Sequence, residues 1–318
     1  MALSEFDIIS QYFKKKYKHN TSIIAGIGDD AAIVEMPSDK FMAVSTDTLV
    51  SGVHFPKITK PFDIAYKSLA VNISDMAAMG AEPLYVTLAI TLEHNDDKWL
   101  EDFANGFFSI ANKYSIELIG GDVSRGPLSI TVQIFGVVPK GQQIMRSGAM
   151  PGDTIYVTGK LGMAAYGLHM LNEGNDNIDK LCLQRLNRPE PRLDIGISLR
   201  NKATACIDIS DGLKSDLSHL LSASMAGAEI EIEQIPFYNK LNDVDSDLRL
   251  SLGMLSGDDY ELCFTLNNKF SVEIDNIRKE FNCEITRIGT IKETPGIVWN
   301  SKYDLSDEFL NSLGYLHF

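Results

Sequence analysis

The sequence lacks the features of disulfide-rich, zinc-binding and membrane proteins. Its four cysteines, Cys182, Cys206, Cys263 and Cys283, lie far apart and form no C-x-x-C pair, which argues against a disulfide framework and a zinc site. No apolar run approaches the ~18 residues that a membrane span requires. The first 13 residues hold acidic residues inside their apolar stretch, and the lysines follow it, the reverse of a secretory signal. We therefore expect a reduced, cytoplasmic protein.

Basic residues are also scarce. The chain has 29 Lys and Arg against 43 Asp and Glu, so its formal net charge is −14. Nucleic acids and anionic membrane surfaces are bound largely through Lys and Arg, so neither is an expected partner. The acidic residues are themselves unevenly divided, with 26 Asp and 17 Glu. An Asp excess is typical of turns and helix caps, but it is also typical of magnesium chemistry.

The length and hydrophobic content indicate a folded protein of two domains. The chain has 318 residues, 44% of them hydrophobic, and domains average roughly 150 residues. A Gly- and Pro-rich segment without periodicity, residues 139–152, marks a boundary, which predicts an N-terminal domain of 1–140 and a C-terminal domain of 141–318. Both halves mix helical and strand-like periodicity, so the predicted fold class is α/β (α+β) with two mixed domains.

Hydrophobic periodicity and turn residues predict the individual elements. Helices are expected at 4–17, at 64–79, after a capping Asp96, and at 161–172, 192–200, 212–224 and 270–281. Strands are expected at 22–34, 41–50, 84–92, 116–120, 128–138, 153–158, 204–209, 228–233, 260–266, 284–290 and 296–299.

The most informative pattern is the repeated placement of Asp beside Gly or Ser, mainly at the ends of predicted strands. The clusters are Gly26–Asp30, Ser45-Thr46-Asp47, Gly120-Gly121-Asp122, Asp208–Gly212 and Gly257–Glu261, and Asp75 adds a carboxylate to an otherwise apolar helix. Mg²⁺ binds oxygen ligands and is usually shared between a few carboxylates and substrate phosphates. Small neighbouring residues let a phosphate approach the backbone. Each cluster alone is more typical of a turn or cap, but together they favour a site with several metal ions.

Other chemistries fit poorly. Gly159-Lys160 lacks the remaining residues of a P-loop, and Gly26-x-Gly28 lacks the third glycine of a dinucleotide-binding loop. The six histidines form no zinc-binding pattern. His54 is more typical of a loop or core histidine than of a catalytic base, although contact with a substrate is an alternative.

Eight segments in order along the chain resemble the thiamine-monophosphate kinase family. They are Gly28–Ala32, Ser45–Leu49, Gly52–Phe55, Asn72–Gly80, Leu118–Asp122, Arg146–Ala149, Ile207–Leu213 and Asp259–Leu262. The wider superfamily is aminoimidazole ribonucleotide synthetase-like. Two of its other branches are disfavoured, because no Cys precedes Cys182 and the chain does not end in a cysteine motif.

The resemblance implies transfer of a phosphoryl group from ATP to thiamine monophosphate, giving ADP and thiamine diphosphate, with several Mg²⁺ ions. It also implies a homodimer formed through the N-terminal sheet and a C-terminal domain that closes over the nucleotide. The implied metal ligands are Asp30, Ser45, Thr46, Asp47, Asp75, Asp122, Asp208 and Asp211. The implied ATP contacts are Tyr114, Gly121, Asp122, Arg146 and Ser210. The implied substrate contacts are His54, Asp258 and Tyr315.

The acceptor phosphate of such a reaction has a second pKa near ~6, so it is already mostly dianionic at neutral pH and requires no general base. We therefore assign no catalytic base. Two alternatives remain: an ATP-dependent synthetase of a purine intermediate, and a non-catalytic nucleotide- or Mg²⁺-binding regulator.

Overall fold

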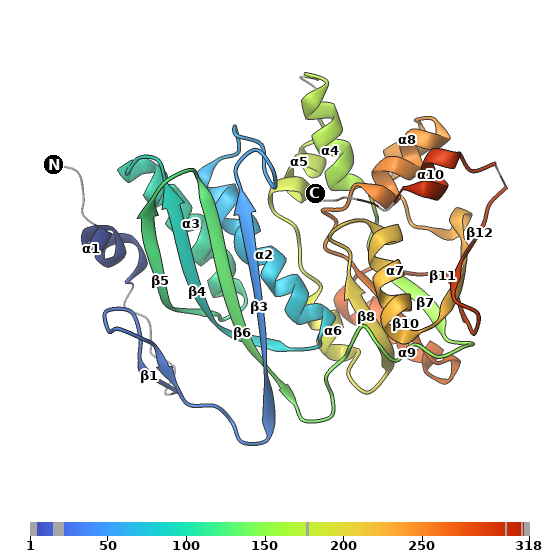
Figure 1. Cartoon of the computed structure of the whole chain (residues 1–318), viewed down its shortest axis with the longest axis horizontal. Coiled ribbons are helices and arrows are strands. Elements are labelled where there is room, and N and C mark those ends of the chain that lie inside the picture. The colour runs from blue at the N-terminus through green and yellow to red at the C-terminus, as the bar shows by residue number, and fades with distance from the viewer. Residues whose placement is uncertain (1–4, 15–21, 176–177, 303, 313, 315–318) are drawn as a thin grey trace. The chain divides into compact units, whose positions relative to one another are not determined.

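The computed structural model describes residues 5–14, 22–175, 178–302, 304–312 and 314 (Figure 1). The chain forms two compact units, which are described separately below. Unit 1 comprises residues 1–76 and 81–141, and unit 2 comprises residues 77–80 and 142–318. No helix in the described ranges is long and apolar enough to cross a membrane.

Unit 1 is built on a four-stranded sheet with strand order β3-β6-β4-β5, in which only the β4–β5 pair is parallel. Helices α2 and α3 lie along one face of this sheet (Figure 1). Its elements are α1 (Glu5–Ile8), the π-helix η1 (Ile9–Phe13), β1 (Ile23–Ala25), β2 (Ile33–Val34), β3 (Lys40–Val50), α2 (Pro61–Ala78), β4 (Glu82–Leu92), α3 (Asp97–Lys113), β5 (Glu117–Arg125) and β6 (Ser129–Pro139).

Local signals explain the helices that cover this sheet. Helix α2 begins at Pro61, whose fixed φ suits a first helical position, and it ends before Gly80, which has a φ of +61°. Asp96 caps α3, because its carboxylate accepts a hydrogen bond from the backbone N–H of Trp99 at 2.9 Å. The predicted apolar face of α3 is buried, including Phe103 and Phe107. These predictions are confirmed.

The single strand predicted at 22–34 is wrong. The structure has two short antiparallel strands there, β1 and β2, with a turn between them that contains Gly26 and Gly28. Gly28 has a φ of +112°, which is incompatible with a continuous strand. The N-terminal helix ends at Phe13, within the predicted range of 4–17, whose last residues and Ser4 lie outside the described residues.

Unit 2 is built on a six-stranded sheet with strand order β12-β9-β11-β7-β10-β8. Its strands are β7 (Thr154–Thr158), β8 (Ala203–Asp208), β9 (Gly227–Glu231), β10 (Leu262–Leu266), β11 (Ile285–Lys292) and β12 (Gly296–Asn300). Its helices are α4 (Met163–Asn172), α5 (Lys180–Asn187), α6 (Leu193–Ser198), α7 (Leu213–Ser224), α8 (Ser246–Leu250), α9 (Ser271–Phe281) and α10 (Asp307–Asn311), with short helical turns η2 (Ile232–Gln234), η3 (Asn239–Asn242), η4 (Ser251–Leu255) and η5 (Asn268–Phe270).

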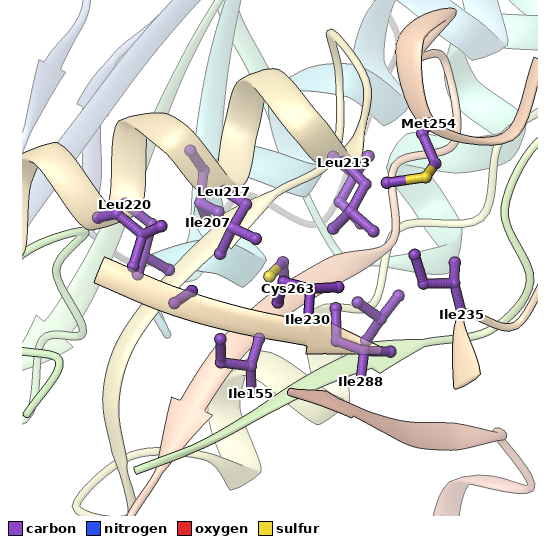
Figure 2. Close-up of a cluster of buried hydrophobic side chains, with 14 of the residues drawn as sticks. Ile155, Ile207, Leu213, Leu217, Leu220, Ile230, Ile235, Met254, Cys263 and Ile288 are labelled. Atoms are coloured by element: carbon purple, nitrogen blue, oxygen red, sulfur yellow. The ribbon is translucent and has the colours of Figure 1, made fainter. Parts of the chain in front are cut away.

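Helix α7 packs on this sheet and so fixes the loop that precedes it. Figure 2 shows Leu213, Leu217 and Leu220 of α7 directed toward side chains of the strands, among them Ile207 and Cys263. All four cysteines are buried, and none of them forms a disulfide. Helices α5, α8 and α10, which have five to eight residues each, were not predicted.

Candidate active site

The first group of site residues is an acidic pair with a hydroxyl beside it, in unit 1. Ser45 and Asp47 are alternate residues of β3, so their side chains lie on the same face of the strand. Helix α2 presents Asp75 to that face, and the Ser45 hydroxyl donates a hydrogen bond to Asp75 Oδ2. The carboxyl groups of Asp47 and Asp75 are also hydrogen-bonded to each other. The structure therefore brings together three of the predicted metal ligands.

The surroundings of this pair disfavour the ionised form of Asp47. Burial, followed by the negative charge of Asp75 and the hydrogen bond to it, raises the pKa of Asp47 to about 7. Two carboxyls that share a partly buried site bind one proton between them, since both cannot ionise without a large electrostatic cost. A divalent cation would replace that proton and bind an oxygen of each carboxylate. Two carboxylates and a hydroxyl are also the oxygen ligands that suit Mg²⁺.

Two other predicted ligands in unit 1 do not lie beside the pair. Thr46 is exposed, and its place between Ser45 and Asp47 puts its side chain on the opposite face of β3. Only its backbone oxygen could therefore join a ligand set with Asp47. Asp122 lies on β5, separated from β3 by β6 and β4, and its Oδ2 accepts a hydrogen bond from the Ser124 hydroxyl at 2.6 Å.

Asp30 occupies the exposed turn between β1 and β2, where its backbone N–H donates to Asp29 Oδ1 at 3.2 Å. Within the ranges that the structure describes, no three His, Cys, Asp or Glu side chains gather as a ready-made metal site. Among the predicted metal ligands of unit 1, Asp47 and Asp75 thus form a pair, whereas Asp30 and Asp122 lie apart from it. Such an arrangement suits ions that complete their coordination with substrate phosphates and water.

The remaining predicted residues of unit 1 lie in turns. His54 Nδ1 accepts a hydrogen bond from the backbone N–H of Val50 at 2.9 Å, which assigns the ring proton to Nε2. The backbone oxygen of His54 accepts a bond from the buried Lys67 ammonium at 3.2 Å, which fixes the loop. Tyr114 is the C-terminal cap of α3.

Gly121 can only be glycine at its position. Its φ is +152°, and a Cβ atom there would lie 1.9 Å from the backbone oxygen of Leu88 on β4. The close approach of β4 and β5 therefore depends on the missing side chain. The same feature leaves the exposed backbone beside Asp122 open to a ligand.

The second group of site residues lies in unit 2, where β8 ends and α7 begins. Asp208 is buried at the last position of β8, and Ser210 and Asp211 follow it. Asp216, in the first turn of α7, accepts hydrogen bonds from the backbone N–H groups of Ser210 and Asp211, both at 3.0 Å. This carboxylate thereby holds the loop that carries two predicted metal ligands and a predicted ATP contact.

Asp216 was not identified from the sequence. The sequence feature that could have indicated it is an acidic residue in the first turn of the helix that follows Asp211-Gly212. That feature is also typical of an ordinary helix start. Burial and then the charge of Asp211 raise the pKa of Asp216 to about 7, against the opposing effects of the two N–H groups and of the Arg146 charge. Arg146 therefore lies within electrostatic reach of this loop.

Asp258 lies against the same loop. Its backbone N–H donates to the backbone oxygen of Ser210 at 2.9 Å, and its side chain is half-buried. The structure thus brings Asp258 together with Ser210 and Asp211. Tyr315, the third predicted substrate contact, lies outside the described residues.

Comparisons with known proteins identify the family of the chain. Residues 28–138 match the family described as AIR synthase related protein, N-terminal domain, and residues 150–300 match AIR synthase related protein, C-terminal domain. The chain is 45% identical over 296 residues to a protein of Buchnera aphidicola named thiamine-monophosphate kinase, covering 92% of each chain.

Two solved structures are similar over most of the chain. A crystal structure of thiamine-monophosphate kinase from Stenotrophomonas maltophilia has a TM-score of 0.84 and 38% identity, covering 92% of this chain and 94% of that one. A structure of AaThiL complexed with AMPPCP and TMP has a TM-score of 0.77 and 29% identity, covering 98% of this chain and 96% of that one. The predicted fold class and family are confirmed: the chain belongs to the thiamine-monophosphate kinase family.

Proposed function

We propose that this protein transfers the γ-phosphoryl group of ATP to thiamine monophosphate, giving ADP and thiamine diphosphate. The observation that carries the proposal is the 45% identity over 92% of both chains to a protein of that name. A similar structure with AMPPCP, an ATP analogue, and TMP bound supports the same pair of substrates. The oxygen-rich pair at Asp47 and Asp75 supports a reaction that depends on divalent cations.

The proposed cofactor is Mg²⁺, as several ions. The residues that would hold it are Asp30, Ser45, Asp47, Asp75, Asp122, Asp208, Asp211 and the backbone of Thr46. When bound, the ions would neutralise phosphate charge and align the two substrates. The raised pKa of Asp47 supports this assignment, because a bound cation would offset the burial and the negative charge of Asp75 that raise it.

The proposed substrate contacts divide between ATP and the acceptor. Tyr114, Gly121, Asp122, Arg146 and Ser210 would contact ATP, with Arg146 placed against phosphate oxygens. His54, Asp258 and Tyr315 would contact thiamine monophosphate. The neutral His54 ring, protonated at Nε2, suits a hydrogen bond to an acceptor oxygen.

No residue is required to remove a proton during the transfer. An oxygen of the dianionic acceptor phosphate attacks the γ-phosphorus of ATP while the bond to the β,γ-bridging oxygen breaks, and ADP leaves with that oxygen. The transfer is direct and in line, without a covalent enzyme intermediate. The task of the chain is to orient both phosphates and exclude water, since positioning and charge stabilisation supply most of the rate in such reactions.

We also propose functional domains of 1–140 and 141–318, the first carrying metal and nucleotide-phosphate sites and the second closing over both substrates. A cytoplasmic location is proposed as well, and the four unpaired buried cysteines support it.

A homodimer through the sheet of unit 1 is proposed too. Met42 and Val44 of β3, which lie on the same face of the strand, are each about half exposed, at 55% and 47%. Beside them lies an apolar pocket between the sheet residues Met42, Ile119 and Phe135 and the segment that carries Val34 and Met36. Apolar side chains grouped on an exposed sheet are typical of an interface with another chain. Sedimentation of the wild type and of a Met42→Lys variant tests this, and a monomeric wild type would contradict it.

The function is tested by measuring ADP release with thiamine monophosphate, thiamine and aminoimidazole ribonucleotide precursors in parallel, with and without MgCl₂. We expect turnover only with thiamine monophosphate and only with the metal. An Asp122→Asn variant should lose nearly all turnover while melting at the wild-type temperature. ADP binding without turnover on any acceptor would instead indicate a regulator, and turnover on a purine precursor would indicate a synthetase.

A further inference from the structure

The turn that carries Asp258 has an unusual backbone. Gly257, Asp258 and Tyr260 have φ values of +67°, +67° and +50°, so three of four consecutive residues are in the left-handed region. That region is unfavourable for residues with a Cβ atom and especially so for a bulky aromatic residue such as Tyr260. Conformations of this kind persist only where surrounding contacts enforce them, and they occur most often at functional sites.

Backbone hydrogen bonds join this turn to the loop after β8. The N–H of Asp258 donates to the oxygen of Ser210 at 2.9 Å, and the N–H of Tyr260 donates to the oxygen of Ile209 at 2.9 Å. The N–H of Ile209 donates in return to the oxygen of Glu261 at 2.8 Å. A Cβ atom on Gly257 would lie 2.1 Å from the Ser210 oxygen, so the two segments are in direct contact.

Two buried carboxylates fix the inner side of the turn. Asp259, 2% exposed, accepts a hydrogen bond from the backbone N–H of Gly162 with both oxygens, at 2.9 and 3.1 Å. Glu261, 0% exposed, accepts two bonds of 2.6 Å from Arg192 and one of 2.6 Å from the Thr158 hydroxyl. Both carboxylates are therefore paired within unit 2 and have fixed positions.

We propose that Asp259 and Glu261 are positioning residues that hold Asp258 against Ser210 in the geometry that binds the acceptor. The inference rests on the proposed function, since it assigns a use to the substrate contact at Asp258. Side chains 259 and 261 point into unit 2 while 258 and 260 remain partly exposed, so fixing the buried pair also fixes the direction of Asp258. Asp259 acts through its hydrogen bond to Gly162, which anchors the turn to the start of α4.

The test compares Asp259→Ala with Asp259→Asn, because Asn keeps one oxygen acceptor for Gly162 and Ala keeps none. We expect Asp259→Ala to raise the KM for thiamine monophosphate about tenfold, the effect of losing one well-placed hydrogen bond. The KM for ATP should change less than about twofold, because Ser210, the ATP contact beside the turn, is also held by Asp216 through its backbone N–H at 3.0 Å. Asp259→Asn should restore the acceptor KM to near the wild-type value.

A double-mutant cycle with Asp258→Ala separates positioning from a general structural role. If Asp259 acts through Asp258, the acceptor KM of the double variant equals that of Asp258→Ala alone. Independent effects that multiply, or equal losses for ATP and acceptor, would overturn the inference. So would an Asn variant as impaired as the Ala variant.

Folding is checked by thermal melting and by ADP affinity in the presence of Mg²⁺. If Asp259→Ala does not fold, a second pair of variants tests the same turn through Glu261. Thr158→Val removes the hydroxyl that donates to Glu261, whereas Thr158→Ser keeps it. We expect the same specific rise in acceptor KM for Thr158→Val and none for Thr158→Ser. If the wild type turns over thiamine monophosphate but the effects of Asp258→Ala and Asp259→Ala on the acceptor KM multiply in the double variant, this inference alone is refuted. Absence of wild-type turnover on that acceptor refutes the proposed function and this inference with it.

Discussion

Replacing Asp47 by Asn should make the metal-free protein more stable and the enzyme inactive. In the unfolded chain Asp47 ionises near its ordinary pKa of 3.8, whereas in the folded protein it ionises only at about 7. Between these values the folded state binds more protons than the unfolded state, so wild-type stability falls as the pH rises through this window. Asn does not ionise and therefore avoids the loss.

The size of the effect follows from the two pKa values. A tenfold change in acidity corresponds to about 1.4 kcal/mol, so the difference between 3.8 and about 7 sets an upper limit of about 4 kcal/mol. Asp47 retains some contact with water, which weakens the repulsion, and we expect about 2 kcal/mol. The advantage of the variant should be absent near pH 4, grow up to pH 7 and remain constant above it.

Urea unfolding at pH 4, 6 and 8 in the presence of EDTA measures this difference. Asp39→Asn, which alters an exposed turn carboxylate in the same way, is the matched control and should change stability by less than about 0.5 kcal/mol. Added MgCl₂ should stabilise the wild type at pH 8 and stabilise Asp47→Asn much less. A wild type as stable as the variant at pH 8, or a difference that does not depend on pH, would refute the reasoning.

Three further predictions concern other parts of the chain. His54→Ala should raise the KM for thiamine monophosphate about tenfold and leave kcat nearly unchanged, because the ring contacts the substrate and does not remove a proton from it. The shape of the pH–rate profile should not change. A large loss of kcat would contradict this. Gly121→Ala should lower the free energy of unfolding by at least about 2 kcal/mol in urea titration, because its Cβ would overlap the backbone oxygen of Leu88. The control Gly120→Ala, whose Cβ would lie 3.5 Å from Thr87, should leave the free energy of unfolding nearly unchanged. Equal effects of the two variants would show that the close approach of β4 and β5 is not limiting. Arg192→Met should cost about 3 kcal/mol, because the buried Glu261 loses two hydrogen bonds of 2.6 Å and keeps Arg185, at 3.5 Å, as a weaker charged partner. Lys98→Met, which breaks an exposed pair with Asp102, should cost less than about 1 kcal/mol. Similar midpoints of denaturation for the two variants would contradict this.

The parts of the fold that sequence predicted best are those with long periodic segments and explicit caps. Helix α3, with its capping Asp96, and the strands β4 and β6 follow from periodicity over 11 residues or more. The predicted strand at 22–34 failed because its apolar residues continue through a turn that glycines permit. Apolar content alone does not distinguish a strand from two short strands joined by such a turn.

The candidate site was predictable in its chemistry but not in its pairings. Repeated Asp beside small residues indicated carboxylate–metal chemistry, and Asp75 stood out on its apolar helix. Only the structure reveals that Asp75 pairs with Asp47, 28 positions earlier, since that contact depends on how α2 packs against the sheet. Asp216 was not identified from the sequence, and Asp259 was noted only as part of the Gly257–Glu261 cluster. Each acts on backbone N–H groups, and the sequence does not show which N–H groups a carboxylate will reach.

Each of the two units contains a buried carboxyl group with a raised pKa. Asp47 in unit 1 and Asp216 in unit 2 both have a pKa raised to about 7, in each case by burial first and a neighbouring carboxylate second. Burial and a neighbouring negative charge both disfavour the ionised form of such a carboxyl group. Such groups are understandable where a bound cation supplies positive charge. An acidic chain that must bind two phosphorylated substrates therefore has a physical reason to place such carboxylates in both of its units.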